Sequence, residues 1–195
     1  GMIPSDSPSS PPPKGAETSG TQPAPSPQLR AQTDRVLWLA LLFSHGLYAF
    51  LLQAVLPLPA DGAGASDMAS LQVIFLAMAL GTAGAALVLD ATRLSEGAID
   101  RLIDAQSASD RTANKSAASL ANAVADRIFV SSILRSALAE ATSIMGLVAA
   151  MIGAVPRSRA LLFVAVGVAV HLYCRPKLQA ALDRLAARTP PGASR

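Results

Sequence analysis

The sequence predicts an all-α fold, a polytopic membrane bundle of four helices, and three observations lead to it. Of the 195 residues, 51% are hydrophobic and only 15% are charged, whereas roughly a quarter of an average soluble domain is charged. The apolar residues are gathered into four long runs. The basic residues lie unequally on the two sides of those runs, as they do in proteins that are oriented in a membrane.

The four apolar runs are the predicted membrane helices. A spanning helix needs about 20 predominantly apolar residues, and three of the runs, 36–56, 71–89 and 133–155, have about that length. The fourth run, 160–174, is short and reaches the length only when it is extended to 159–177. We therefore expect four spans, of which the fourth has the shortest apolar run.

The distribution of lysine and arginine gives the orientation. Fourteen of these residues lie before the first run, in the segment 90–135 before and into the third run, or from Arg175 onwards, against two on the other side, Arg157 and Arg159. By the positive-inside rule, both termini and the 90–132 segment are cytoplasmic. The net charge of +3 therefore points to the lipid bilayer as the partner and not to nucleic acid.

The ends of the chain differ from its middle. Residues 3–30 include eight prolines, so we expect residues 1–30 to form a disordered tail; a proline-rich ligand for a partner domain is the alternative. A cleavable signal peptide fits poorly, because the first apolar run begins only at Val36. Residues 31–178 form the predicted membrane domain, and 179–195 a basic cytoplasmic tail.

The 90–132 segment has helical periodicity of its own. Apolar residues recur there at three- and four-residue spacings, namely Leu94, Ala98, Leu102 and Ala105 and, on the return side, Leu120, Val124 and Ile128. Helices two and three are therefore expected to continue beyond the bilayer as an antiparallel helical hairpin. The hairpin either only packs against itself or also offers a docking surface for a cytoplasmic partner.

Glu140 is the residue that most requires an explanation, because it lies inside the third apolar run. A carboxylate in hydrocarbon costs a few kcal/mol, so it is by default a candidate functional group. Burial favours its neutral form, and such a group can take up and release a proton. The alternative is a structural carboxylate that is hydrogen-bonded between helices, with Thr142, Ser143 or a histidine as donor.

The two histidines fall at a similar depth. With a rise of ~1.5 Å per residue, His45, His171 and Glu140 all lie within about 6 Å of the predicted bilayer centre. A proton relay through these three groups is expected to include Ser143, Thr142 and Tyr48, with help from Ser44 and Tyr173. Alternatively, each histidine is a hydrogen-bonded packing residue. Arg135 is expected to reach the inner interface by snorkelling.

Small residues recur along the second and third runs, and they allow close helix packing. The predicted packing residues are Ala77, Gly81, Ala85, Ser143, Gly146 and Gly153. They serve either contacts within one chain or a homo-oligomeric interface. The single cysteine, Cys174, and the two histidines leave no recognisable metal cluster, disulfide framework or catalytic motif, so we expect no cofactor and no enzyme activity.

The segment 137–150, ALAEATSIMGLVAA, resembles the carboxylate helix of the c subunit, or proteolipid, of rotary ATP synthases. The resemblance implies that Glu140 binds a translocated proton or sodium ion. The 90–132 connection is much longer than the family's short loop, so the role in a rotor ring does not carry over. In overall plan the chain also resembles small four-helix bacterial inner-membrane proteins, which implies a bacterial inner-membrane location.

Two functions are therefore expected from the sequence. The first is a proton-binding subunit of an ion-coupled membrane complex that uses Glu140, with other membrane subunits or self-association as its partners. The second is a non-catalytic accessory, anchor or assembly subunit. A water-accessible or lipid-facing carboxyl favours the first, and a carboxyl sealed by hydrogen bonds favours the second. A membrane-embedded enzyme is the weakest alternative, because no catalytic constellation can be assembled.

Overall fold

The computed structural model describes residues 25–55, 69–112 and 116–188. Within these ranges the chain is helical almost throughout and contains no strand, so the all-α prediction is confirmed. The helices are α1 (Pro27–Phe50), α2 (Ala69–Leu89), α3 (Glu96–Thr112), α4 (Ala117–Met151), α5 (Arg157–Tyr173) and α6 (Leu178–Arg188). Two short π-helical turns, η1 (Leu51–Val55) and η2 (Asp90–Leu94), follow α1 and α2.

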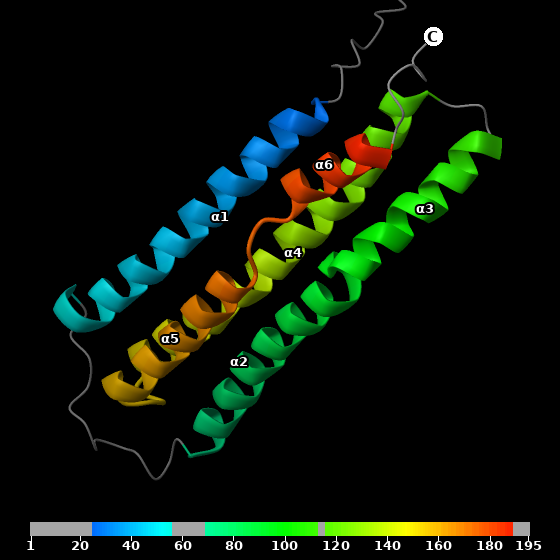
Figure 1. Ribbon diagram of the computed structural model, residues 1–195. Coiled ribbons are helices and arrows are strands. Elements are labelled where there is room, and N and C mark those ends of the chain that lie inside the picture. The colour runs from blue at the N-terminus through cyan, green and yellow to red at the C-terminus, as the bar shows by residue number, and fades with distance from the viewer. Residues whose placement is uncertain (1–24, 56–68, 113–115, 189–195) are drawn as a thin grey trace, which may run out of the picture.

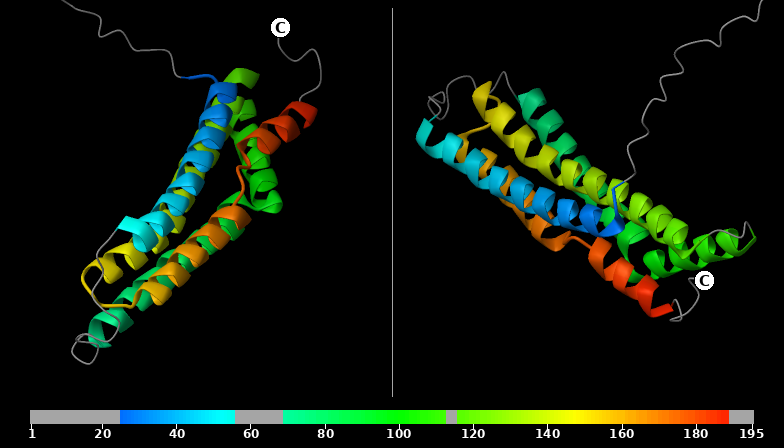
Figure 2. Two further views of the ribbon diagram at one scale, coloured as in Figure 1. Left: turned by 90° about the vertical axis from the view of Figure 1, so that its left-hand side faces the viewer. Right: turned by 90° about the horizontal axis from the view of Figure 1, so that it is seen from above.

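The 35-residue helix α4 is the centre of the bundle, and every other α-helix packs against it. Helix α1 runs parallel to α4, whereas α2 and α5 run antiparallel to it (Figure 1). The shorter helices α3 and α6 lie together at the end of the bundle that holds the start of α1 and of α4 (Figures 1 and 2).

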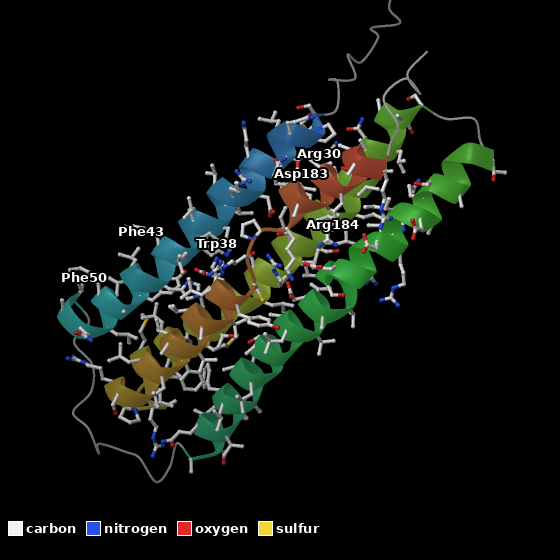
Figure 3. All side chains as sticks on the ribbon, in the orientation of Figure 1. Arg30, Trp38, Phe43, Phe50, Asp183 and Arg184 are labelled. Carbon is white, nitrogen blue, oxygen red and sulfur yellow. The ribbon has the colours of Figure 1, made fainter. Side chains whose placement is uncertain are left out.

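The outer surface of the long helices is apolar. Phe43 is 78% exposed and Phe50 57%, and both point away from the other helices (Figure 3). Four helical segments are long and apolar enough to cross a membrane, namely Pro27–Val55, Ala69–Leu94, Ala117–Met151 and Arg157–Arg188. This architecture fits a multi-pass membrane protein, since exposed apolar side chains are stable in lipid and costly in water.

The first helix begins earlier than the apolar run suggests. Pro27 occupies its first turn, where a missing N–H costs nothing, and the Ser26 side chain accepts a hydrogen bond from the amide of Leu29 at 3.3 Å. Residues 27–30 are therefore helical and do not belong to a disordered tail, which corrects the predicted boundary. The prediction for residues 1–24 lies outside the described residues.

The segment after α2 is a separate helix and not a direct continuation of α2. The backbone of Ser95 is extended, and α3 begins at Glu96. Helix α3 packs against the first half of α4 through buried Ile99, Ile103, Val124 and Ile128. The two helices thus form an antiparallel pair, although with a break at Ser95 that the sequence periodicity did not predict.

The predicted basic tail is largely another helix. Leu178, Ala181 and Leu185 of α6 are buried in the same apolar cluster as Ile99 and Ile103, because the spacing of three and four residues places them on one face. Residues 178–188 therefore belong to the folded bundle, which corrects the assignment of 179–195 to a tail; residues 189–195 lie outside the described part.

Ion pairs join α6 to α3 along their exposed faces. Arg184 lies 2.8 Å from Glu96, and Arg188 lies 2.8 Å from Asp100 and 2.9 Å from Asp104. The hydrogen bond and charge of Arg184 hold the pKa of Glu96 below its usual value. The acidic face of α3 is thus matched to the basic face of α6.

The predicted topology can be tested by cysteine labelling in intact cells. The test uses single cysteines at Asp61 or at Ser109, in a chain in which Cys174 is replaced by alanine. A cysteine at position 61 is expected to react with an impermeant reagent from outside, whereas one at position 109 should react only after the cells are permeabilised. Ser109 is exposed on α3, so the reagent can reach it, while Asp61 lies outside the described residues. Labelling of the Ser109→Cys variant from outside would reverse the orientation inferred from the basic residues.

Candidate functional site: a buried carboxylate and imidazole

Glu140 lies on the inner face of α4 and is only 7% exposed. Its Oε1 accepts hydrogen bonds from Ser44 Oγ at 2.5 Å and from Tyr48 Oη at 2.6 Å. Its Oε2 lies 3.2 Å from Nδ1 of His45. All three neighbours come from α1, because residues four apart lie on the same face of a helix. One helix thus surrounds the carboxylate with three polar groups.

The side chain of His45 is fully buried. Its Nδ1 is 2.6 Å from the carbonyl oxygen of Leu41, and since a carbonyl can only accept, Nδ1 carries the hydrogen. Both the Leu41 carbonyl oxygen and the Glu140 carboxylate lie near this N–H. In the neutral ring the other nitrogen, Nε2, carries no hydrogen, and it has no hydrogen-bond partner among the described residues.

Gly167 of α5 allows this site to be compact. A Cβ at this position would overlap Ser143 Oγ and would lie 3.1 Å from His45 Nε2. Only a residue without a side chain therefore lets α5 come so close to α1 and α4. Ser143 Oγ, like His45 Nε2, is buried and has no hydrogen-bond partner in the described structure.

His171 extends the site towards the start of α1. Its ring centroid is 5.3 Å from that of His45, and it stacks on Trp38 with centroids 5.5 Å apart. Its Nε2 lies 2.9 Å from the Trp38 carbonyl oxygen, while Trp38 Nε1 donates to the His171 carbonyl oxygen at 3.1 Å. Figure 3 shows Trp38 between α1 and the junction of α5 and α6. His171 Nδ1 is buried without a partner among the residues described.

The structure brings some of the predicted relay residues together and separates others. Glu140, His45, Ser44 and Tyr48 are in direct contact, and His171 and Ser143 adjoin His45. Thr142 instead faces α2, where its Oγ1 lies 3.0 Å from that of Thr82. Tyr173 is 70% exposed on the outer surface. These last two residues therefore lie away from the Glu140 carboxylate.

A second group of buried polar residues lies nearer the cytoplasmic side of the predicted topology. We call it the inner charge cluster; its members are Asp34, Asp90, Ser132, Arg135 and Lys177. Arg135 Nη1 and Lys177 Nζ each lie 2.7 Å from an oxygen of Asp90. Ser132 Oγ donates to Asp34 Oδ1 at 2.6 Å and accepts from Arg135 Nη2 at 3.3 Å.

Contrary to the expectation from the sequence, the Arg135 side chain does not reach the membrane interface. It is fully buried. The reason is that partners are available inside the bundle: Asp90 binds one terminal nitrogen of the guanidinium, and Ser132 accepts from the other. Sequence reasoning overlooked Asp34 and Lys177, because both lie just outside the apolar runs. The signal that was available is the spacing of three or four residues between Ser132, Ser136, Glu140 and Ser143 on α4, with Arg135 next to Ser136. This spacing places the five polar residues on one helix face.

Only some of the predicted packing residues lie at helix contacts within the chain. Gly146 lies at a close approach of α4 to α5, where an added Cβ would lie 2.5 Å from Phe163 Cβ. Gly153 has a positive φ of 74° and ends α4, so its role is helix termination and not packing. Ala77, Gly81 and Ala85 are exposed and make no packing stripe within the chain; Ala79, Ala83 and Ala86 are the buried residues of α2.

The arrangement defines a class, a helical bundle suited to spanning a membrane that encloses a carboxylate–imidazole pair. Comparison with protein-family models, with curated proteins and with solved structures finds no match for this chain. Within the described ranges, no three His, Cys, Asp or Glu side chains are grouped so as to hold a metal ion.

Proposed function

We propose that this protein is a proton-binding component of a membrane complex, and that the proton is bound by the Glu140–His45 pair. The observation that carries the proposal is the 3.2 Å separation of Glu140 Oε2 and His45 Nδ1 inside the bundle. A carboxyl group and an imidazole are the side chains best suited to exchanging a proton near neutral pH. Both lie within helices that are long and apolar enough to span a membrane.

The chemistry of the pair follows from its surroundings. A carboxylate beside an imidazolium, or a carboxyl beside a neutral imidazole, leaves the pair with no net charge, which a low-dielectric interior favours. Proton uptake or release through His45 Nε2 changes that charge by one unit. Ser143 Oγ and the His171 ring lie next to this nitrogen and offer the next positions for the proton.

A second candidate function is a purely structural one, in which the protein is an accessory or assembly subunit. One observation favours it: Glu140 is almost enclosed, and its Oε1 is satisfied by both Ser44 and Tyr48. A carboxyl that is enclosed by hydrogen bonds, and not accessible to water or lipid, serves to hold α1 and α4 together. The two functions differ in whether the protonation of Glu140 changes with pH.

The test is an infrared titration of the purified chain, combined with modification by a hydrophobic carbodiimide, which reacts with protonated carboxyls. We expect a carboxyl band that changes with pH and a carbodiimide adduct mapped to Glu140. Glu140→Gln should remove both signals and leave the fold intact, because the amide keeps the shape and can still accept from Ser44 and Tyr48. His45→Gln should retain the band but shift its pH dependence.

Thr142→Val is the matched control, because it removes a buried polar group of α4 that faces α2 instead of Glu140. A band in the wild type that does not change with pH, together with normal complex formation by Glu140→Gln, would refute proton binding. In that case the structural function predicts that Glu140→Leu lowers the free energy of unfolding by about 1–3 kcal/mol, since Ser44 and Tyr48 lose their acceptor.

A further inference from the structure

A partly open cavity of about 420 Å³ lies where α2 gives way to α3, against the middle of α4. Its polar wall contains Thr92, Arg93, Arg127 and Ser131, and its apolar wall includes Leu102 and Val130. None of these residues belongs to the Glu140 site or to the inner charge cluster. The cavity therefore requires a separate explanation.

The two arginines of this cavity differ from most other arginines at this end of the bundle. Neither Arg93 nor Arg127 has an ion-pair or hydrogen-bond partner among the described residues, and both are exposed. By contrast, Arg30 pairs with Asp126, Arg135 with Asp90, and Arg184 with Glu96. Two unpaired guanidinium groups on one cavity wall form an arrangement suited to a phosphate group.

The acidic residue in the same wall does not cancel this charge. Asp126 also lines the cavity, but its Oδ1 lies 2.8 Å from Arg30 Nη1, so its charge is matched by a cation from α1. The cavity wall as a whole thus keeps the positive charge of Arg93 and Arg127. An anion that enters it meets donors from two different helical segments, η2 and α4.

The position of the cavity next to the apolar surface indicates which kind of molecule bears the anionic group. Arg93 lies four residues beyond Leu89, where the second apolar run ends, and Ser131 lies two residues before the third run begins at Ile133. Val88 is one turn from Thr92, and Leu134 is one turn from Val130, on the same helix faces. Val88 is 62% exposed, Val130 64% and Leu134 52%, so an apolar surface continues from the cavity towards the predicted bilayer.

We propose that this cavity binds the headgroup of an anionic phospholipid from the adjacent leaflet. Arg93 and Arg127 hold the phosphate, and the acyl chains lie along Val88, Val130 and Leu134. Basic cavities between helices at the inner membrane surface are suited to such lipids, whose charge is attracted there and whose chains remain in hydrocarbon. The proposal rests on the membrane-spanning architecture and is independent of proton binding by Glu140.

The experiment measures lipid binding to the purified full-length chain in a neutral detergent, by native mass spectrometry and by the rise in unfolding temperature. The probes are phosphatidylglycerol, phosphatidylcholine with the same chains, and inorganic phosphate. We expect saturable binding of phosphatidylglycerol, at least about tenfold tighter than that of phosphatidylcholine, because the choline cation offsets the phosphate charge and is repelled by the two arginines, whereas glycerol carries no charge. Inorganic phosphate should bind more weakly still, since it lacks the chains.

Arg93→Gln and Arg127→Gln are each expected to weaken phosphatidylglycerol binding about tenfold, and the double variant further. Arg101→Gln is the matched control: it removes the same charge from the exposed face of α3, where Arg101 Nε donates to the carbonyl of Gly97. Arg93→Lys keeps the charge and should lose less affinity than Arg93→Gln.

Three results would overturn the proposal. The first is equal binding of phosphatidylcholine and phosphatidylglycerol, which would indicate unspecific lipid association. The second is inorganic phosphate binding as tightly as the lipid, which would make the site one for a soluble anion. The third is unchanged lipid affinity in the double variant, or an equal loss in Arg101→Gln, either of which would place the bound lipid elsewhere.

Discussion

Replacing Arg135 by methionine is expected to lower the free energy of unfolding by about 3–5 kcal/mol, the usual cost of removing one partner from a buried ion pair. Arg135 is fully buried and holds Asp90 at 2.7 Å, while its second terminal nitrogen donates to Ser132. Two carboxylates and two cations make up the charges of the inner charge cluster, so the variant leaves a net negative charge inside the bundle. Chemical or thermal unfolding in detergent measures the loss.

The double variant Arg135→Met/Asp90→Leu separates this explanation from a loss of packing alone. Because it removes both charges of the pair, it should be less destabilised than the sum of the two single variants. Arg101→Met serves as the control on an exposed helix face and should change stability by less than about 0.5 kcal/mol. Strict additivity, or a cost for Arg135→Met near that of the control, would contradict an energetically coupled cluster.

The sequence was sufficient to predict four helices that are long and apolar enough to span a membrane, because each depends on a local property. A run of about 20 apolar residues remains apolar however the helices are arranged, and prolines limit its length. The boundaries were predicted less well. Helix α1 begins at Pro27 and α6 covers Leu178–Arg188, both outside the apolar runs. The start of α1 is set by the Ser26 cap and by Pro27, a local signal that the apolar pattern does not contain, whereas the ion pairs of α6 with α3 depend on the arrangement of the helices.

Glu140 could be identified from the sequence for the same local reason, since a carboxylate within an apolar run is costly wherever it points. Its partners could not be predicted, because they depend on the rotation of α1 about its axis. Thr142 and Ser143 illustrate the point. Neighbouring residues in a helix point about 100° apart, and Thr142 consequently faces α2 while Ser143 faces α5.

The inner charge cluster and the Glu140 site share one face of α4, with Ser132 and Arg135 about one turn before Ser136 and Glu140. Helix α1 contributes to both, through Asp34 to the first and through Ser44, His45 and Tyr48 to the second. His171 lies between them in depth, with one nitrogen held by Trp38. This alignment is the reason why a change in the cluster is expected to disturb the packing of α1 against α4 at the Glu140 site as well.

Gly146→Ala and Gly81→Ala, the same substitution on two membrane helices, are expected to act in opposite directions. At Gly146 the new Cβ would lie 2.5 Å from Phe163 Cβ and 2.9 Å from the backbone oxygen of Ala160. Backbone atoms cannot move aside as a flexible side chain does, so α5 must shift away from α4. Overpacking of this kind costs about 1–3 kcal/mol, and more where a whole interface must separate.

At Gly81 the new Cβ meets nothing within 4 Å, so the change should stabilise α2 by up to about 1 kcal/mol through its higher helix propensity. Unfolding of both variants in the same detergent gives the comparison, and it separates crowding from any general effect of losing a glycine. A Gly81→Ala variant that is as destabilised as Gly146→Ala would mean that the outward face of α2 is itself a packed interface, occupied by a second copy of the chain or by another subunit. The sign of that single measurement therefore decides whether Ala77, Gly81 and Ala85 face lipid or protein.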